Sequence, residues 1–328
     1  MDKLVAQFPK QIADAILIAS RSELSFDKNK TFNNVVICGM GGSGIGGKMV
    51  AQLFGDQAKL PIVLVQNYQI PAFVDDSTLV IASSYSGNTE ETLSVTKQAD
   101  EKGATIVGVS SGGELIQFCK KNEYEFIKLP GGNPPRSMLA FSAVQLIHIL
   151  SVAGVIDKNA LDLIAKARHF LNDELIHVKN QAKALANHIY EKQSIFYTNS
   201  SLEFVAIRAR QQINENSKQL CWHHVIPEMN HNELVGWAGG NEHFAPVFFV
   251  SQFLNNRNKT RTKLSQEIIQ NKCHSILSIE GRGKTKIEES LYFIHIIDWA
   301  SLFLADKRGV DPVEVKVIDY LKRTLDKK

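Results

Sequence analysis

The sequence predicts an α/β protein with two domains, each a parallel sheet covered by helices on both faces. Short runs rich in Val and Ile, bounded by Gly and Ser, alternate with longer helical patterns in both halves of the chain. This alternation is typical of parallel sheets with crossover helices. The chain has 328 residues, 44% of them hydrophobic, which fits two domains of about 150 residues each. We therefore expect two α-β-α sandwiches joined by a connector.

The first domain, expected at residues 1–155, should contain five strands separated by helices. These strands are expected at residues 34–38, 61–65, 78–82, 105–109 and 124–129. The apolar stretch 142–154 predicts a buried helix, whereas 157–190 is helical in pattern, more polar and without a strong strand. We therefore expect a helical connector at residues 156–190.

The same alternation begins again in the second domain, expected at residues 191–328. Asp311 followed by Pro312 is typical of a helix cap with proline in the first turn, so it predicts the start of a final helix. The two halves favour a structural duplication, although the sequence shows no obvious repeat. The expected strands are 194–198, 245–250 and 274–279, and the expected helices are 203–213, 261–271 and a long one ending near Asp306.

Composition and charge exclude several classes of partner. The formal net charge is +3, from 37 Lys and Arg against 34 Asp and Glu spread along the chain, so we expect no nucleic-acid partner. The N-terminal MDKLVAQFPKQIADAIL predicts an amphipathic helix rather than a secretion signal. No run approaches the roughly 18–20 apolar residues that cross a bilayer, so we expect no membrane partner. The widely separated cysteines lack a CxxC pair and indicate reduced thiols of a cytoplasmic protein. They are Cys38, Cys119, Cys221 and Cys273.

A glycine-dense turn, VVICGMGGSGIGG, follows the first predicted strand and precedes a helix. Gly39, Gly41 and Gly44 satisfy the dinucleotide-binding pattern G-x-G-x-x-G. That fold needs an acidic residue at the end of the second strand, about 20 residues on, but here the strand ends in Gln66 and Asn67. We therefore expect no nicotinamide or flavin cofactor, and an anion held by amides at the helix N-terminus fits better. The alternative is a tight turn that binds no ligand.

A second loop, IASSYSGNTEETL, also follows a strand and opens a helix. Hydroxyl groups gather there around Gly87. A phosphate monoester carries about 1.5 to 2 negative charges, and neutral donors at a helix N-terminus can bind it without Lys or Arg. The alternative is that Ser and Thr only cap the helix. A cap uses only one hydroxyl group, however, and this loop has four. The hydroxyl residues of this loop are Ser83, Ser84, Ser86 and Thr89.

This second loop resembles the phosphate loop of the sugar isomerase (SIS) domain. The resemblance extends over residues 39–325 to the bifunctional phosphoglucose/phosphomannose isomerase family, which carries two SIS domains. It implies a fold of two SIS-type α-β-α sandwiches and an isomerase that interconverts glucose 6-phosphate and mannose 6-phosphate with fructose 6-phosphate through a cis-enediolate. The motifs that carry it, in order, are GMGGSGIGG, SYSGNTEETL, PPRSMLAFS, INENSK, PEMNHNELVGW and GVDPVEVKVIDYLKRTL.

Aldose–ketose isomerisation needs a base near C1 and C2 and an acid/base for ring opening. By resemblance, Glu215 in INENSK is the proton-shuttling carboxylate, and His231 in NHNEL opens the ring from the neighbouring subunit of a homodimer. Lys322 matches the lysine that assists at the ring oxygen. The alternatives are a solvated Glu215, a structural loop histidine, and a solvated helix face for Lys322. That face also carries Lys316, Arg323, Lys327 and Lys328. Glu203, Glu228 and Glu233 do not match the family's base.

Arg136 follows Pro134 and Pro135, whose fixed φ values stiffen the chain before an apolar helix. A permanently charged, forked donor suits charge that develops on an enediolate; the alternative is an Arg paired with a neighbouring carboxylate. The sequence PPRSMLAFSAV differs modestly from the family pattern after this Arg, which leaves the substrate preference open. The resemblance assigns substrate binding to Gly42, Ser43, Ser84, Ser86, Thr89 and Arg136.

Histidines and carboxylates elsewhere do not form a metal-binding pattern. His223, His224 and His243, taken with Glu228 and Glu242, match no ligand spacing such as HExxH. We therefore expect neither a metal nor another cofactor. The alternative function is a non-catalytic, sugar-phosphate-binding SIS regulatory protein, against which the absence of a helix-turn-helix segment and the presence of INENSK and NHNEL both count.

Overall fold

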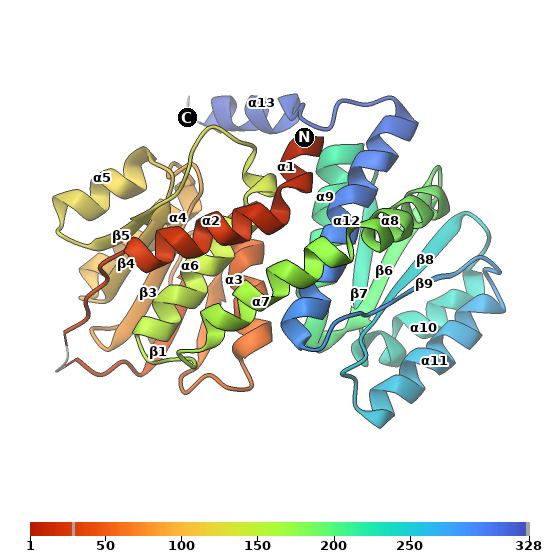
Figure 1. Ribbon diagram of the computed structural model, residues 1–328, viewed down its shortest axis with the longest axis horizontal. Helices are drawn as coiled ribbons and strands as arrows, with labels where there is room; N and C mark the ends of the chain where they lie inside the picture. Colours follow the sequence, from red (N-terminus) through yellow and green to blue (C-terminus); the bar gives the residue numbers. More distant parts are fainter. Residues whose placement is uncertain (28–29, 326–328) are drawn as a thin grey trace. The chain divides into compact units, whose positions relative to one another are not determined.

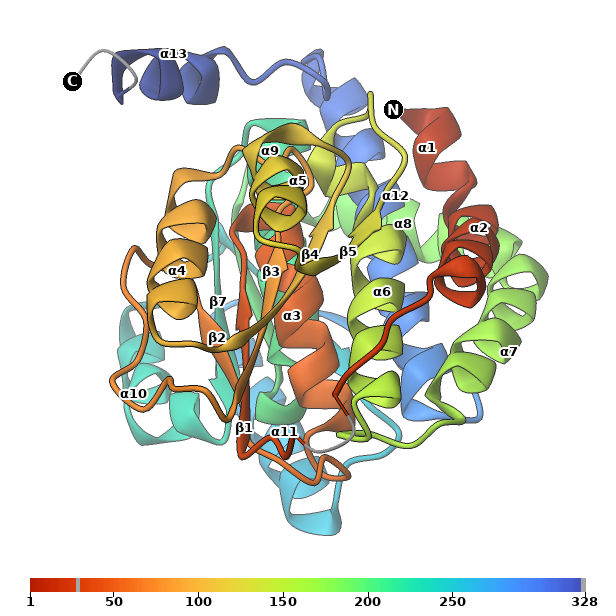
Figure 2. The same ribbon diagram turned by 90° about the vertical axis from the view of Figure 1, so that its left-hand side faces the viewer.

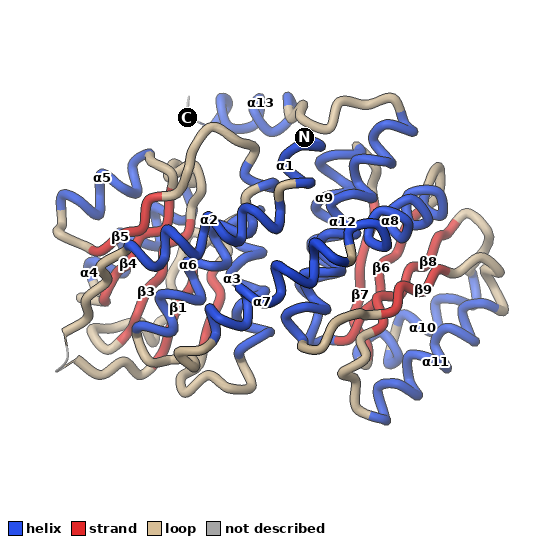
Figure 3. The backbone as a smooth tube through the Cα atoms, in the orientation of Figure 1, coloured by secondary structure: helices blue, strands red, loops and turns tan. Residues whose placement is uncertain are grey.

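The computed structural model describes residues 1–27 and 30–325, and the chain forms two compact units (Figure 1). The N-terminal unit contains Ala6–Asp173 together with Gly283–Leu291. The C-terminal unit contains Met1–Val5, Glu174–Arg282 and the chain from Tyr292 onward. Each unit has its own parallel sheet flanked by helices (Figure 3), which confirms the predicted fold class.

The N-terminal sheet has the strand order β2-β1-β3-β4-β5. Its central strands β3 and β4 are buried except at Thr105, the first residue of β4, as expected where helices cover both faces. Helices α4 and α5 pack on one face, and α3 and α6 lie on the other with α2 and α7 outside them (Figure 2). The strands are β1 (Asn34–Cys38), β2 (Ile62–Val65), β3 (Thr78–Ser83), β4 (Thr105–Ser110) and β5 (Glu125–Lys128). The helices are α2 (Phe8–Arg21), α3 (Gly41–Phe54), α4 (Glu90–Glu101), α5 (Gly113–Lys121), η1 (Pro135–Ser137), α6 (Leu139–Val152) and α7 (Ala160–Asp173).

The C-terminal sheet has the order β7-β6-β8-β9, which repeats the winding of the first four strands of the other sheet. This repetition confirms the expected structural duplication. The strands are β6 (Gln193–Asn199), β7 (Cys221–Ile226), β8 (Phe244–Val250) and β9 (Leu277–Glu280). The helices are α1 (Asp2–Ala6), α8 (Leu175–Ile189), η2 (Ser200–Leu202), α9 (Glu203–Ser217), η3 (Glu228–His231), α10 (Glu233–Gly236), η4 (Trp237–Gly239), α11 (Asn256–Gln270), α12 (Lys286–Arg308) and α13 (Lys316–Leu325). The start of α12, up to Leu291, belongs to the N-terminal unit.

The prediction that Asp311 and Pro312 open the final helix is wrong, because α13 begins at Lys316. Asp311 Oδ1 accepts the backbone N–H of Val313 at 2.8 Å, and this closes a local turn. The backbone carbonyl of Asp311 accepts a hydrogen bond from the ammonium group of Lys218 at 2.7 Å, not from a following backbone N–H as it would at the start of a helix. Asp311 therefore bonds like a helix cap, but no helix begins there.

Other elements also differ from the predictions. Strand β7 was not expected, and the N-terminal amphipathic helix is two helices, α1 and α2, separated at Gln7. Pro9 lies at the start of α2, where its missing N–H needs no partner. The predicted helix 203–213 continues to Ser217 and so includes Glu215. Within residues 1–27 and 30–325, no helix is long and apolar enough to cross a membrane.

Candidate functional site

The predicted phosphate-binding loops follow two neighbouring strands of the N-terminal sheet. The glycine turn leaves the carboxyl end of β1, and the hydroxyl-rich loop leaves the carboxyl end of β3, which pairs with β1. In the order β2-β1-β3, the chain winds away from β1 in one direction and from β3 in the other. Ligands of open α/β sheets bind outside the carboxyl ends of the strands at such a switch point. We call the predicted residues gathered here the switch-point site: Gly42, Ser43, Ser84, Ser86, Thr89 and Arg136.

The hydroxyl-rich loop is held together by its own side chains. Ser84 Oγ lies 2.8 Å from Thr89 Oγ1 and accepts the backbone N–H of Gly87 at 3.1 Å. Thr89 occupies the N-cap position of α4 but makes no side-chain cap hydrogen bond, so simple helix capping does not explain it. Gly87 has φ +75°, and a Cβ there would lie 1.8 Å from the carbonyl of Gly112. Only glycine fits this turn.

The two loops are also bonded to each other. The buried Ser43 Oγ accepts the backbone N–H of Tyr85 at 3.1 Å. Ser86 is exposed, and its Oγ accepts the N–H of Asn88 at 3.3 Å. Ser83 Oγ is buried below the loop and has no hydrogen-bond partner among the described residues. The site therefore offers hydroxyl groups and amides at the N-terminal ends of α3 and α4.

Two glycines on one face of α3 bring Arg136 to the switch-point site. A Cβ on Gly42 would lie 3.1 Å from the carbonyl oxygen of Pro135 and 3.4 Å from the Cα of Arg136. One turn further, a Cβ on Gly46 would lie 3.0 Å from Ser142 Oγ of α6. Residues four apart lie on the same helix face, so the two glycines let α6 and the preceding η1 turn approach closely. Arg136 is buried, with 6% of its surface exposed.

Glutamine replaces the acidic residue that a dinucleotide site would need. Gln66 follows β2, and its Nε2 would lie 2.5 Å from a Cβ placed on Gly44. The amide side chain therefore packs directly against the glycine turn. Gln66 thus supplies an amide at the position where ribose recognition would need a carboxylate.

Glu215 lies in the C-terminal unit, in the last turn of α9, and is half-buried. A polar seam fixes this part of α9 to α12. Arg208 makes a buried two-pronged ion pair with Asp298, with distances of 3.0 Å from Nε and 2.9 Å from Nη2. Gln212 donates to the same carboxylate at 2.7 Å. Asn216 and Ser217 bond to Ser301 of α12, at 2.9 and 2.7 Å.

His231 and Glu215 lie near opposite ends of β7, one beyond its carboxyl end and the other before its amino end. Glu215 precedes β7, whereas His231 follows it and is exposed at the end of η3. A strand rises about 3.3 Å per residue, so the two ends of β7, Cys221–Ile226, are on the order of 20 Å apart. The structure does not bring these two predicted residues together within one chain.

Lys322 lies on α13, a helix without buried residues. Lys316 and Arg323 are exposed on the same helix, whereas Lys327 and Lys328 lie outside the described residues. The apolar side chains of α13 are also exposed, among them Val317, Tyr320 and Leu321. The helix therefore has an apolar face that the described chain does not cover.

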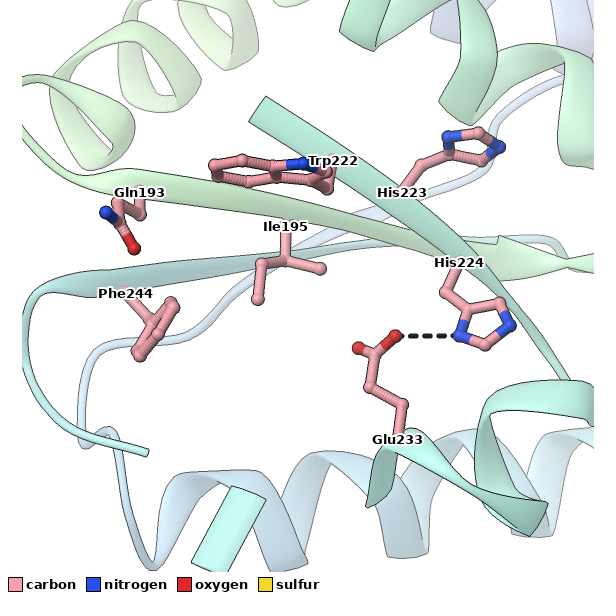
Figure 4. A pocket seen from close by; sticks show the side chains of 7 residues that line it. All are labelled: Gln193, Ile195, Trp222, His223, His224, Glu233 and Phe244. Atoms are coloured by element: carbon pink, nitrogen blue, oxygen red, sulfur yellow. Dashed lines mark hydrogen bonds and ion pairs between the residues drawn. The ribbon is translucent and has the colours of Figure 1, made fainter. Parts of the chain in front are cut away.

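A hydrogen-bond network that the sequence analysis missed includes His224 and Glu233, which line a pocket of about 510 Å³ in the C-terminal unit (Figure 4). Glu233 accepts from Tyr197 Oη and lies 2.7 Å from His224 Nδ1, while Trp237 donates to Tyr197 Oη at 3.0 Å. Burial and the Glu233 carboxylate raise the pKa of Tyr197, so its hydroxyl remains a donor. The pocket is lined by Gln193, Ile195, Trp222, His223, His224, Glu233 and Phe244.

No strong sequence signal marks this network. Trp222 and His224 alternate with Cys221 and His223 along β7, but the strand itself was not predicted. In the part of the chain that the structure describes, no group of three or more His, Cys, Asp or Glu side chains is arranged to hold a metal ion.

The fold and the switch-point site define a protein with two SIS-type domains. Residues 31–121 match the SIS domain family, and residues 178–325 match the family of the bacterial phosphoglucose isomerase C-terminal SIS domain. The chain belongs to the bifunctional phosphoglucose/phosphomannose isomerase family. A member from Caldicellulosiruptor bescii is 34% identical over 99% of this chain and 98% of its own length. Another from Aquifex aeolicus is 34% identical over 90% of this chain and 91% of its own length.

Other similar proteins are more distant in name or in sequence. A protein from Sulfolobus acidocaldarius named D-glucosamine-6-phosphate 4-epimerase is 30% identical, over 89% of each chain. The C-terminal domain of glucosamine-fructose-6-phosphate aminotransferase from Francisella tularensis has a TM-score of 0.76 at 15% identity, covering 95% of this chain and 97% of its own. The structural likeness shows the fold alone.

Proposed function

We propose that this protein is an aldose–ketose isomerase that interconverts glucose 6-phosphate and mannose 6-phosphate with fructose 6-phosphate. Its family membership supports the reaction class, because the relatives from C. bescii and A. aeolicus are named as phosphoglucose/phosphomannose isomerases. The observation that carries the proposal is the convergence of Gly42, Ser43, Ser84, Thr89 and Arg136 at one switch point.

The switch-point site would hold the phosphoryl group of the substrate. Two helix N-termini, of α3 and α4, meet there, and backbone amides with a helix dipole favour an anion. Hydroxyl donors add hydrogen bonds without a permanent ion pair, which would keep product release fast. Arg136, buried beside Gly42, would stabilise the negative charge that develops on the enediolate.

Glu215 would move the proton between C1 and C2, so the cis-enediolate would form and collapse on the same face of the sugar. His231 would open the ring, because imidazole gives and accepts protons near neutral pH. Lys322 would assist at the ring oxygen. These three roles rest on the family motifs INENSK, NHNEL and GVDPVEVKVIDYLK.

The active assembly would be a homodimer in which His231 completes the site of the partner copy. Glu215 and His231 lie near opposite ends of β7, about one strand length apart, so one sugar cannot touch both in the same chain. Exposed apolar side chains of the C-terminal unit support a contact with a second copy. They include Trp222 on β7, Val235 on α10 and the apolar face of α13. We also propose a cytoplasmic location, which the four free, buried cysteines support.

The test is turnover of fructose 6-phosphate by the purified protein, with glucose 6-phosphate and mannose 6-phosphate measured separately and with chelator present throughout. We expect both aldose phosphates to form at rates that the chelator does not change. Binding without any product would instead favour the regulatory alternative. Because one relative is named as an epimerase of glucosamine 6-phosphate, the same preparation should also be incubated with that amino sugar.

A further inference from the structure

The end of α9, which carries Glu215, has an unusual backbone. Lys218 follows the helix with φ 52° and ψ 38°, in the left-handed region. In the described residues only three non-glycine positions have positive φ, and Lys218 is one of them. Glycine or asparagine usually ends a helix in this way, because a larger side chain is strained there. A lysine at this position therefore needs a compensating interaction.

The Lys218 side chain supplies that interaction. Its Nζ donates to the backbone carbonyl of Glu215 at 2.7 Å and to that of Asp311 at 2.7 Å. The last four carbonyl groups of a helix have no partner within it, and Glu215 contributes one of them. The second bond reaches the turn that leads to α13 and Lys322. One ammonium group thus joins the backbones of two motifs, INENSK and the segment that begins GVDP. Lys218 and Asp311 are 93 positions apart in the chain.

A second cation bonds to the residues on either side of Lys218. Arg308, at the end of α12, donates from Nε to the carbonyl of Ser217 at 2.9 Å and from Nη1 to Gln219 Oε1 at 3.1 Å. Cations at a helix C-terminus also interact favourably with its dipole. The last turn of α9 is therefore fixed by Lys218, by Arg308 at the end of α12, and by the polar seam between α9 and α12.

We propose that Lys218 is a positioning residue for Glu215. Its ammonium group ties the Glu215 backbone to the Asp311 turn and so restricts where the carboxylate can point. Lys218 needs no contact with the substrate for this role. The inference rests on the proposed role of Glu215 as the base, and it adds a residue whose loss should lower turnover through geometry alone.

The experiment replaces Lys218 by glycine, which accepts the left-handed backbone and removes the side chain. Misplacing a catalytic group can cost about 100-fold, so we expect Lys218→Gly to lower kcat by about 10- to 100-fold while KM changes less than about twofold. The melting temperature should stay the same or rise, because the backbone strain is relieved. Lys218→Arg, which keeps a long cationic donor, should recover part of the lost kcat.

The matched control is Glu123→Gly. Glu123 has φ 58° just beyond the exposed end of α5, so glycine relieves the same strain at a residue outside the proposed site. It should leave kcat unchanged. Full activity of Lys218→Gly, or a loss of kcat only in proportion to a lower melting temperature, would overturn the inference. An inactive wild type, assayed in parallel, would instead refute the proposed function itself.

Discussion

Ser43 Oγ accepts the backbone N–H of Tyr85 at 3.1 Å, although the two residues are 42 positions apart. This bond joins the turn after β1 to the loop after β3, and both of its groups are buried. The two proposed anion-binding segments are therefore fixed relative to each other by the chain itself. Such preorganisation lowers the cost of binding a phosphoryl group.

Replacing the loop hydroxyls should weaken substrate binding more than turnover. Ser84→Ala removes one proposed phosphate donor and the acceptor for the Gly87 N–H. A hydrogen bond to a charged group is worth about 1.5–3 kcal/mol, so we expect KM for fructose 6-phosphate to rise about 10- to 100-fold with a smaller change in kcat. Thr89→Val should act in the same direction. Initial-rate kinetics measure both effects.

The control for these variants is Ser94→Ala on the same helix α4. The Ser94 hydroxyl donates to the backbone carbonyl of Tyr68 at 2.9 Å, away from the loop. Its loss should leave KM unchanged. Equal KM values for Ser84→Ala and Ser94→Ala would argue against phosphate binding at this loop.

A methyl group on Gly42 should displace Arg136. The new Cβ would lie 3.1 Å from the Pro135 carbonyl oxygen, closer than ordinary contact, so η1 would have to shift. We expect Gly42→Ala to reduce kcat/KM at least about 100-fold while the protein remains folded. The control is Gly131→Ala, where the added Cβ makes only ordinary contacts of 3.6 Å with Ser111. An unchanged rate in Gly42→Ala would show that the position of η1 does not matter.

Acid should destabilise the C-terminal unit through His295. Burial lowers the pKa of His295 to about 4, although Asp298 opposes the shift. The unfolded chain takes up a proton near pH 6.5, so this contribution to stability is complete above pH 6.5 and is lost as the pH falls toward 4. The loss amounts to about 3 kcal/mol.

The measurement is the free energy of unfolding of wild type and His295→Gln between pH 7 and pH 4. The variant should show a flatter pH dependence across this range. His169→Gln, at an exposed position, should follow the wild type. If the free energy of unfolding of His295→Gln falls with pH as steeply as that of the wild type, other groups cause the acid sensitivity.

Mixing two inactive variants tests the shared site. If Glu215 of one copy works with His231 of another, a mixed dimer of Glu215→Gln and His231→Ala contains one site with both native residues. Random exchange makes about half of the dimers mixed, so activity should return to about a quarter of the wild-type value. Each variant alone should stay inactive after the same treatment. No recovery, with exchange verified by mass, would place both residues in one chain's site or remove one from catalysis.

Most of the fold could be predicted because its strands are continuous apolar runs. Residues 34–38 and 78–82, for example, become β1 and the greater part of β3, buried between helix layers. Strand β7 was missed because CWHHVI lies at the sheet edge and is partly exposed. Its Trp and His side chains give neither the apolar run of a central strand nor a strict polar alternation.

The candidate site could be predicted only in part. The loops after β1 and β3 are evident as Gly- and Ser-rich segments following strands. The approach of Arg136 to Gly42 could not be predicted, because it depends on how closely α6 packs on α3. The left-handed Lys218 was equally hidden, because local sequence favours glycine there and the compensating carbonyl of Asp311 is distant in the chain.

The most direct test compares turnover and binding in Glu215→Gln. A positioned base contributes about 100- to 10,000-fold, so kcat should fall by that factor, and incorporation of solvent deuterium into the sugar at C1 or C2 should stop. Calorimetric affinity for fructose 6-phosphate should remain close to wild type, since the switch-point site is intact. Glu203→Gln, in the first turn of the same helix, serves as the control and should remain active. Wild-type deuterium exchange in Glu215→Gln would mean that another group moves the proton.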